Sequence, residues 1–164
     1  MSRYLTREGY DRIAGEIEQL WHKERPNVVA QVTAAAEMGD RSENAEYIYG
    51  KKRLREIDSR LRYLRKKVEG VTVVDLATLP PRKDVVFGAR VTVEAYEKAD
   101  EDPVTRVYRL VDQDESDPTL GRISVQSPIG KALLGKRAGD MVTVSLPKGS
   151  LEMEVIEVFY GAGE

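Results

Sequence analysis

The chain of 164 residues lacks cysteine, has a single histidine and contains no long apolar run. Without cysteine it can form neither a disulfide framework nor a thiolate metal site, and we therefore expect a reducing, cytoplasmic location. No stretch approaches the roughly 18 consecutive apolar residues that cross a bilayer. The first residues, MSRYLTREGY, show no apolar run of the kind found in signal peptides. The sequence thus predicts a soluble protein with no membrane partner.

An excess of charge of one sign is also missing. The chain has 26 Lys and Arg against 28 Asp and Glu, a net charge of -2, which argues against a protein that coats nucleic acid without selectivity. Hydrophobic residues make up 41% of the composition. This suffices for one or two small domains with buried cores, but a large multidomain enzyme is excluded.

The first part of the chain has the composition and periodicity of two long helices, expected at about Thr6–Ala36 and Glu43–Glu69. Because only a few residues around Gly39 connect them, we expect an antiparallel coiled-coil hairpin. The second helix carries apolar residues at alternating spacings of three and four, which is typical of a coiled-coil seam. These residues are Leu54, Ile57, Leu61, Leu64 and Val68.

The first helix has a break in its apolar period at Pro26. A proline inside a helix removes one hydrogen bond and tends to kink the helix. We therefore expect a bend or a local irregularity there, and not an interruption of the helix. The apolar residues before the break, and those that follow one residue out of phase, are Tyr10, Ile13, Ile17 and Leu20, then Trp21, Val28, Val32 and Ala35.

The second part of the chain changes to a period of two, which predicts strands. Turn-forming clusters such as DESDPTLG and PKGS separate these strands. Ser127 and Pro128 fit the start of one short helix, and Gly135 fits its end. The fold class predicted for this part is α+β, a mostly antiparallel sheet with one short helix packed on it.

Two domains follow from this change of pattern: a coiled-coil domain at residues 1–75, a linker at 76–84 and a globular domain at 85–164. Some thirty helical residues form a rod about 45 Å long. The tip of the hairpin is therefore expected to lie remote from the core that supports it.

The stretch MGDRSENAEY places acidic residues at this tip. Asp40 or Ser42 can cap the second helix, and Glu43 and Glu46 in its first turn can complement the helix dipole. A remote tip does not need so many carboxylates for stability, because exposed charges contribute well under about 1 kcal/mol. They are too few to enclose Mg²⁺, which takes its remaining ligands from water, phosphate or a partner. We therefore expect a metal site that another macromolecule completes, at which the carboxylates assist phosphoryl transfer.

The run KKRLREIDSRLRYLRKK, residues 51–67, is strongly basic. A solvated flank of the coiled coil, with side chains that snorkel along apolar surface, explains this run. A track for a nucleic-acid backbone that leads to the tip explains it as well. Few aromatic residues interrupt the run, which argues against recognition of a particular nucleotide sequence.

Four segments together resemble the Gre transcript-cleavage factors of bacterial RNA polymerase, and the GreB branch more than the GreA branch. They are the tip GDRSENAEY, the following KKRLREIDSRLRYL, the strand VVFGARVTV and the segment SVQSPIGKALLGK. The resemblance extends from Leu5 to about Tyr160. It implies an N-terminal antiparallel coiled coil followed by an FKBP-like globular domain, in agreement with the periodicity above. It does not imply prolyl isomerase activity, because few aromatic residues follow Gly70.

The resemblance implies a transcription elongation factor that is not itself an enzyme. Such a factor inserts its tip into the secondary channel of the polymerase and stimulates the polymerase's own Mg²⁺-dependent cleavage of backtracked RNA, which rescues arrested complexes. Asp40 and Glu43 match the acidic pair that stabilises the second catalytic Mg²⁺, an ion shared with the polymerase. Arg41 and Ser42 match the neighbours that shape the tip.

The resemblance also implies two binding surfaces. In one of them, the surface that docks on the polymerase, related proteins of the GreB branch tend to carry Asp where this chain has Gln126. The polar part of that surface therefore departs from the family pattern. A basic patch that contacts the extruded RNA 3′ end is matched by Lys51, Lys52, Arg53 and Arg55. A segment that docks on the rim helices of the channel entrance is matched by Gln126, Ser127, Pro128 and Ile129.

Other functions fit the same residues. One is a protein that binds the secondary channel and inhibits or modulates the polymerase without stimulating cleavage, although retention of both Asp40 and Glu43 favours the cleavage factor. Another is a coiled-coil protein that binds nucleic acid without a polymerase partner, which a steep salt dependence of RNA binding would support. The Ser127–Pro128 pair is, in addition, simply a good helix start.

Overall fold

The computed structural model describes residues 4–41 and 43–162, and their contacts form two compact units. The helical hairpin is Tyr10–Gly70, and the globular unit combines the described residues up to Gly9 with those from Val71 onward. The expected fold class, a helical hairpin and a sheet domain with a short helix, is confirmed. Within the described residues, no helix is long and apolar enough to span a membrane.

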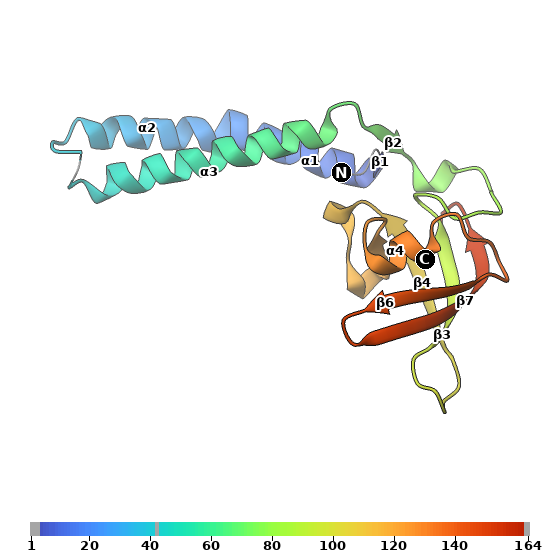
Figure 1. The fold of residues 1–164 in the computed structure, drawn as a ribbon. Coiled ribbons are helices and arrows are strands. Elements are labelled where there is room, and N and C mark those ends of the chain that lie inside the picture. The colour runs from blue at the N-terminus through green and yellow to red at the C-terminus, as the bar shows by residue number, and fades with distance from the viewer. Residues whose placement is uncertain (1–3, 42, 163–164) are drawn as a thin grey trace. The chain divides into compact units, whose positions relative to one another are not determined.

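The hairpin is formed by α1 (Arg7–Gln19), the π-helical turn η1 (Leu20–Glu24) and α2 (Arg25–Ala36), which run antiparallel to α3 (Ala45–Val68). Figure 1 shows α2 and α3 side by side, joined at the tip by a short turn. The expected antiparallel arrangement is therefore confirmed.

The irregularity expected near Pro26 is η1. In this turn the N–H of Arg25 donates to the carbonyl of Leu20, five residues back instead of four. A π-turn accommodates one extra residue in a helix, and the buried positions show the same insertion. The interval between successive seam residues is seven, then eight, then seven, for Ile13, Leu20, Val28 and Ala35.

The assignment of Trp21 to the seam is wrong, because this residue is 43% exposed. The π-turn gives the buried position to Leu20 and leaves its neighbour outside. Arginine guanidiniums from both sides of the hairpin lie over the indole, Arg25 at 5.4 Å and Arg65 at 4.8 Å from the ring centroid. These are distances at which cation–π attraction operates, so Trp21 joins the helices from outside the seam.

On α3, Ile57, Leu61 and Leu64 are buried, as the heptad pattern predicts. Nearer the tip the seam contains Gly50, and a Cβ atom there would lie 2.6 Å from Cγ2 of Val32. That separation is too short for two carbon atoms in contact. The absence of a side chain at Gly50 thus allows α2 and α3 to approach each other closely.

Ion pairs between the helices border the seam. Arg60 donates from Nε and Nη2 to the two carboxylate oxygens of Glu16, at 2.8 and 3.0 Å. Arg25 donates from Nε to Asp58 at 2.8 Å, and this hydrogen bond lowers the pKa of Asp58 below its ordinary value. Such partly exposed pairs each add well under about 1 kcal/mol, so they contribute to pairing specificity more than to stability.

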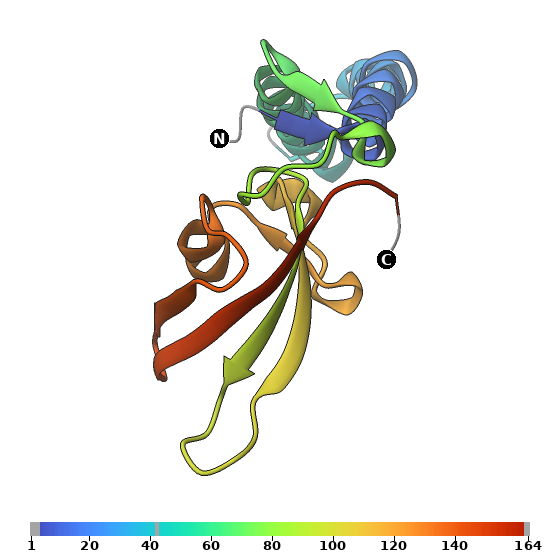
Figure 2. The same ribbon diagram turned by 90° about the vertical axis from the view of Figure 1, so that its right-hand side faces the viewer.

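The globular unit is built on one five-stranded sheet in the order β5-β4-β3-β7-β6. Neighbouring strands are antiparallel except for β4 and β5, which are parallel, so the sheet is mostly antiparallel as predicted. Figure 2 shows its twist and the β3–β4 hairpin that extends from it. The strands are β3 (Arg90–Tyr96), β4 (Val104–Val111), β5 (Arg122–Ser124), β6 (Met141–Leu146) and β7 (Gly149–Phe159).

The core of this unit lies between the sheet and helix α4 (Pro128–Leu133). Alternate residues of β3 face it, which is the period of two that the sequence shows. Leu133 of α4 is fully buried against them. The buried core residues include Val91, Val93, Ala95, Leu110, Val142, Val144, Met153 and Val155.

A second, two-stranded sheet was not expected from the sequence. It pairs β1 (Tyr4–Thr6) in parallel with β2 (Thr72–Val74). The ring of Tyr4 then packs against Phe87 with centroids 5.6 Å apart. Short 3₁₀ turns occur at η2 (Leu76–Thr78), η3 (Gln113–Glu115) and η4 (Pro118–Leu120).

Candidate functional site

The hairpin tip is the turn between α2 and α3, and its cap differs from the prediction. Asn44 is the N-cap of α3: its Oδ1 accepts a hydrogen bond from the backbone N–H of Tyr47 at 3.2 Å. Its Nδ2 donates at 2.7 Å to the carbonyl of Ala35 in the last turn of α2, which also accepts from the backbone N–H of Met38. Asp40 is therefore not the cap, and Ser42 lies outside the described residues.

Both predicted tip carboxylates are exposed. Because α3 begins at Ala45, Glu43 precedes the cap and is not in the first helical turn, where Glu46 alone is found. Gly39 has a φ of 132°, a conformation that residues with side chains rarely adopt, and it lies in the non-helical turn that holds these acids. The guanidinium of Arg41 lies 5.6 Å from the ring centroid of Tyr47. The turn thus presents Asp40 and Glu43 outside the helices on either side of it.

Among residues 4–41 and 43–162, no group of three or more His, Cys, Asp or Glu side chains could hold a metal ion. The donor set at the tip is two carboxylates, Asp40 and Glu43. Carboxylate oxygens suit Mg²⁺, which retains waters and commonly shares its remaining ligands with phosphate. The residues present fit one side of a shared Mg²⁺ site, but they do not fit a self-sufficient one.

The predicted basic patch separates into two groups. Lys51, Lys52 and Arg55 are exposed and make no ion pair with any described residue. Arg53, in contrast, donates to Glu24 across the hairpin and to Glu56 one turn further along α3. These hydrogen bonds raise the pKa of Arg53, with that to Glu24 as the larger cause. Of the four residues, three leave their charge available to a ligand, and Arg53 ties α3 to the other side of the hairpin.

The predicted docking segment surrounds the start of α4. The Oγ of Ser127 accepts a hydrogen bond from the backbone N–H of Gly130 at 3.0 Å and donates to the carbonyl of Ser124 at 2.6 Å. A Cβ atom on Gly130 would lie 2.0 Å from that same carbonyl oxygen, so the turn requires glycine there. Ser127 therefore acts as a helix cap whose hydroxyl is fully used within the fold.

The neighbours of Ser127 are more accessible. Gln126 and Pro128 are exposed, whereas Ile129 is half-buried and packs against the core of the unit. The structure thus gathers the four predicted docking residues on one short segment. Its outer surface consists of an amide and a proline ring.

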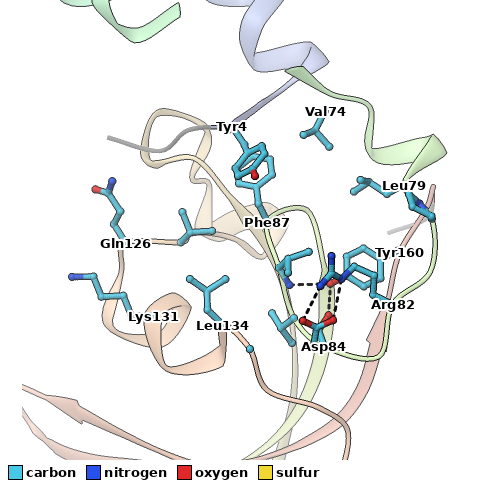
Figure 3. A pocket seen from close by; sticks show the side chains of 15 residues that line it. Tyr4, Val74, Leu79, Arg82, Asp84, Phe87, Gln126, Lys131, Leu134 and Tyr160 are labelled. Carbon is cyan, nitrogen blue, oxygen red and sulfur yellow. Dashed lines mark hydrogen bonds and ion pairs between the residues drawn. The ribbon is translucent and has the colours of Figure 1, made fainter. Parts of the chain in front are cut away.

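Gln126 also borders a largely apolar pocket of about 780 Å³ in the globular unit. In Figure 3, Gln126 and Lys131 lie at one edge of the pocket, and Tyr160, Arg82 and Asp84 lie at the opposite edge. The apolar surface between them comes from Tyr4, Val74, Leu79, Val85, Phe87, Val125 and Leu134. A pocket of this size and character can accept apolar side chains or a small molecule.

The polar groups on the far edge of this pocket bond to one another. The hydroxyl of Tyr160 donates to the carbonyl of Asp84 at 2.5 Å and accepts from the N–H of Val86 at 2.9 Å. Burial raises the pKa of Tyr160 above its ordinary value. Arg82 donates to both carboxylate oxygens of Asp84, at 2.9 and 3.0 Å, and these hydrogen bonds lower the pKa of Asp84. This edge of the pocket is therefore fixed in place.

Two family models match the chain. Residues 3–73 match the model described as "Transcription elongation factor, N-terminal", and residues 80–160 match "Transcription elongation factor, GreA/GreB, C-term". The chain is 48% identical to transcription elongation factor GreB of Yersinia pestis, over 97% of this chain and 90% of that protein. It is 44% identical to transcription elongation factor GreA of Trichlorobacter lovleyi, over 95% and 96% of the two chains. The chain belongs to the GreA/GreB family of transcription elongation factors.

Among solved structures, the chain is similar to GreA factor homolog 1 (Gfh1) of Thermus thermophilus, with 23% identity over 95% of this chain and 97% of that one and a TM-score of 0.42. Membership of the GreA/GreB family therefore rests on the sequence comparisons. It agrees with the order of the units, since the helical hairpin falls within the N-terminal match and the five-stranded sheet within the C-terminal match.

Sequence reasoning missed two features of this GreA/GreB-family chain. One is the cap Asn44, which stands close to Asp40 and Ser42, two residues that are equally good caps by local sequence. The other is the apolar pocket beside Gln126, whose walls come from residues as distant in sequence as Tyr4 and Tyr160. No local pattern indicates such a pocket, because it depends on the pairing of β1 with β2.

Proposed function

We propose that this chain binds bacterial RNA polymerase, inserts its hairpin tip into the secondary channel and stimulates the polymerase's own cleavage of backtracked RNA. The observation that carries this proposal is the presence of two exposed carboxylates, Asp40 and Glu43, in the turn of a long helical hairpin. Membership of the GreA/GreB family supports the choice of partner. Such a partner is found in the cytoplasm, and the chain acts on it as a cofactor protein and not as a nuclease of its own.

The two tip carboxylates take the central role in this proposal. A Mg²⁺ ion held in common with the polymerase would polarise a phosphate oxygen and lower the pKa of a bound water. Asp40 and Glu43 contribute negative charge and oxygen ligands on one side of that ion, and either carboxylate can accept a hydrogen bond from a water molecule. Their position outside both helices leaves them accessible to a partner's site.

The exposed basic residues of α3 bind the extruded RNA in this proposal. Lys51, Lys52 and Arg55 follow the tip within the first turns of the helix and leave their charges unpaired within the described residues. Backbone phosphates are their natural partners, and such contacts carry no sequence preference. Arg53 supports the hairpin instead, because Glu24 and Glu56 already hold its guanidinium.

The globular unit supplies docking affinity. Gln126 and Pro128 form the outer surface at the start of α4, Ile129 packs against the core of the unit, and Ser127 fixes the backbone of this turn. The adjoining apolar pocket offers a place for an apolar side chain of the polymerase rim helices beside the amide of Gln126. Docking here and catalysis at the tip then belong to separate units of the chain.

The test is RNA cleavage in a purified, stalled and backtracked polymerase complex with Mg²⁺, with and without the protein. Release of short 3′ fragments that depends on the protein is the expected result. Suppression of RNA synthesis without fragment release would contradict the proposal and indicate a channel binder that inhibits the polymerase. Steeply salt-dependent RNA binding without any polymerase binding would also contradict it.

A further inference from the structure

Tyr49, near the start of α3, is the most exposed aromatic residue in the described part of the chain, at 73%. Three other exposed rings have partners: guanidiniums lie over Trp21 and Tyr63, and Tyr4 packs against Phe87. The side chain of Tyr49 forms no hydrogen bond, ion pair or ring contact with another described residue. A single exposed ring needs no explanation by itself, so the neighbours of Tyr49 decide whether it has a role.

Arg53 is the natural cover for this ring, because it lies four residues further along α3 and residues at that spacing are neighbours on a helix surface. On the same helix a guanidinium lies 5.4 Å from the ring centroid of Tyr63. Arg53 instead donates to Glu24 across the hairpin at 2.9 Å and to Glu56 at 3.2 Å. Its guanidinium is thus held by carboxylates, and the ring of Tyr49 is left to a ligand.

Two basic residues continue the row that Tyr49 begins. Lys52 lies three residues after Tyr49 and Arg55 three residues after Lys52, so the Cβ atoms of neighbours in the row are about 5–6 Å apart. Both basic residues border the same hollow in the helix surface, and neither makes an ion pair with a described residue. Glu56 lies four residues after Lys52, where it could neutralise the ammonium, but Arg53 holds it. An open aromatic ring therefore lies beside two available cations.

This combination matches the parts of a nucleotide. A base offers its π-face to an aromatic ring, and a phosphate accepts hydrogen bonds from Lys and Arg. In a duplex the bases stack on one another, so the row suits single-stranded nucleic acid. Stacking accepts every base and favours the larger purine ring, and it requires no recognition of a particular sequence.

We infer that Tyr49 stacks on a base of single-stranded RNA while Lys52 and Arg55 hold the adjoining phosphates. The identity of this strand, the RNA extruded from a backtracked polymerase, rests on the proposed function. The ring adds a contact to a base where the basic residues contact phosphate alone. It therefore fixes the position of the strand along α3 and gives it a preference for purines.

The test compares two RNA probes of equal length and charge, a short oligoadenylate and its abasic counterpart. Binding of each to the full chain is measured by fluorescence anisotropy at low salt. The wild-type chain should bind oligoadenylate about tenfold more tightly than the abasic strand. Equal affinity for the two strands, or no saturable binding of either, would overturn the inference.

Variants at Tyr49 locate the base contact. Tyr49→Ala should reduce the affinity for oligoadenylate to within about twofold of that for the abasic strand. Alanine is the strongest helix former, so the substitution should leave α3 intact. Tyr49→Phe retains the ring and should keep the wild-type preference. An equal loss of affinity for both strands in Tyr49→Ala would contradict stacking.

Two further variants are controls. Tyr96→Ala removes an exposed ring from β3, 39% exposed, and should leave both affinities unchanged. Lys52→Gln should weaken both strands by the same factor, because the two probes share their phosphates. A preference for oligoadenylate that falls in Tyr96→Ala as much as in Tyr49→Ala would show a general effect of apolar surface and would overturn the assignment to Tyr49.

These measurements use the protein without RNA polymerase, whereas the proposed function is tested by fragment release from a backtracked complex. Failure of the base contact would leave stimulated cleavage untouched. Adenine-dependent binding without stimulated cleavage would contradict the proposed function and leave the stacking site in place.

Discussion

Glu115 in the globular unit and Glu43 at the hairpin tip are chemically identical, but their surroundings differ. Glu115 is 5% exposed, and its carboxylate accepts hydrogen bonds from the backbone N–H and the hydroxyl of Thr6 and from the backbone N–H of Asp112. Glu43 is exposed and lies before the cap of α3. The fold requires the first carboxylate and makes no comparable use of the second.

This difference separates structural acids from candidate functional acids. A buried carboxylate is tolerated only when donors surround it, which explains why Glu115 has three. An exposed acid on a remote turn adds little to stability, so its presence is better explained by a partner. This distinction fails if replacement of a tip acid destabilises the fold, or if Glu115 can be replaced without loss of stability.

The largest effect is expected for Asp40→Asn. Loss of one carboxylate from the shared metal site should reduce stimulated RNA cleavage about a hundredfold. Polymerase binding and thermal unfolding should stay unchanged, because Asp40 is exposed. Glu46→Gln is the control, an exposed acid in the first turn of α3, and should keep full stimulation. A fall in polymerase binding by Asp40→Asn equal to its fall in cleavage would contradict the division between tip and globular unit.

The next largest effect is expected for Glu115→Ala. The substitution leaves the N–H groups of Thr6 and Asp112 without their acceptor in a buried place. The globular unit should lose about 2–3 kcal/mol of unfolding free energy in urea. Glu152→Ala, at an exposed position of β7, should change it by less than about 0.5 kcal/mol. Similar losses in both variants would show that Glu115 has no special role.

A smaller effect distinguishes two glycines of the hairpin. Gly50→Ala places a methyl group 2.6 Å from Cγ2 of Val32 and should destabilise the hairpin by about 1 kcal/mol, since the strain exceeds the gain in helix propensity. Gly15→Ala meets nothing within 4 Å and should stabilise it by about 0.5–1 kcal/mol. Circular dichroism during urea unfolding measures both. A stabilised Gly50→Ala variant would show that α2 and α3 do not approach as closely as described.

The smallest effects separate the basic residues. Lys52→Gln should reduce cleavage of long backtracked fragments about threefold and leave stability unchanged, because Lys52 has no ion pair among the described residues. Arg53→Gln should instead lower hairpin stability by under about 1 kcal/mol, through loss of Glu24 and Glu56 as partners. The reverse pattern, with Arg53 as the stronger RNA contact, would break the distinction between them.

Features set by nearby residues were predicted from the sequence. Ser127, Pro128 and Gly135 delimit α4 because each acts through the backbone next to it. The phase shift near Pro26 predicted an irregularity, and the structure contains η1 there. The exposed position of Asp40 and Glu43 in the turn between the helices also follows from the local pattern, whereas their role stays a prediction.

Features set by distant residues were not predicted. The cap of α3 is Asn44 because its side chain also reaches Ala35 on the other helix, and no local rule ranks Asn44 above Asp40. The strands β1 and β2 have three residues each, and the whole hairpin separates them in the sequence, although they pair directly with each other. The partner of Arg53 across the hairpin, Glu24, is 29 residues away. Such contacts depend on how the chain folds back on itself.

The most direct test of the central claim is the Mg²⁺ dependence of cleavage in a backtracked polymerase complex, measured with the wild-type chain and with Asp40→Asn at saturating protein. If Asp40 contributes a ligand to a shared ion, the variant should need a higher Mg²⁺ concentration for half-maximal cleavage, and added Mg²⁺ should restore part of the rate. An unchanged Mg²⁺ requirement, with a rate reduced equally at all concentrations, would contradict a metal-binding role for the tip.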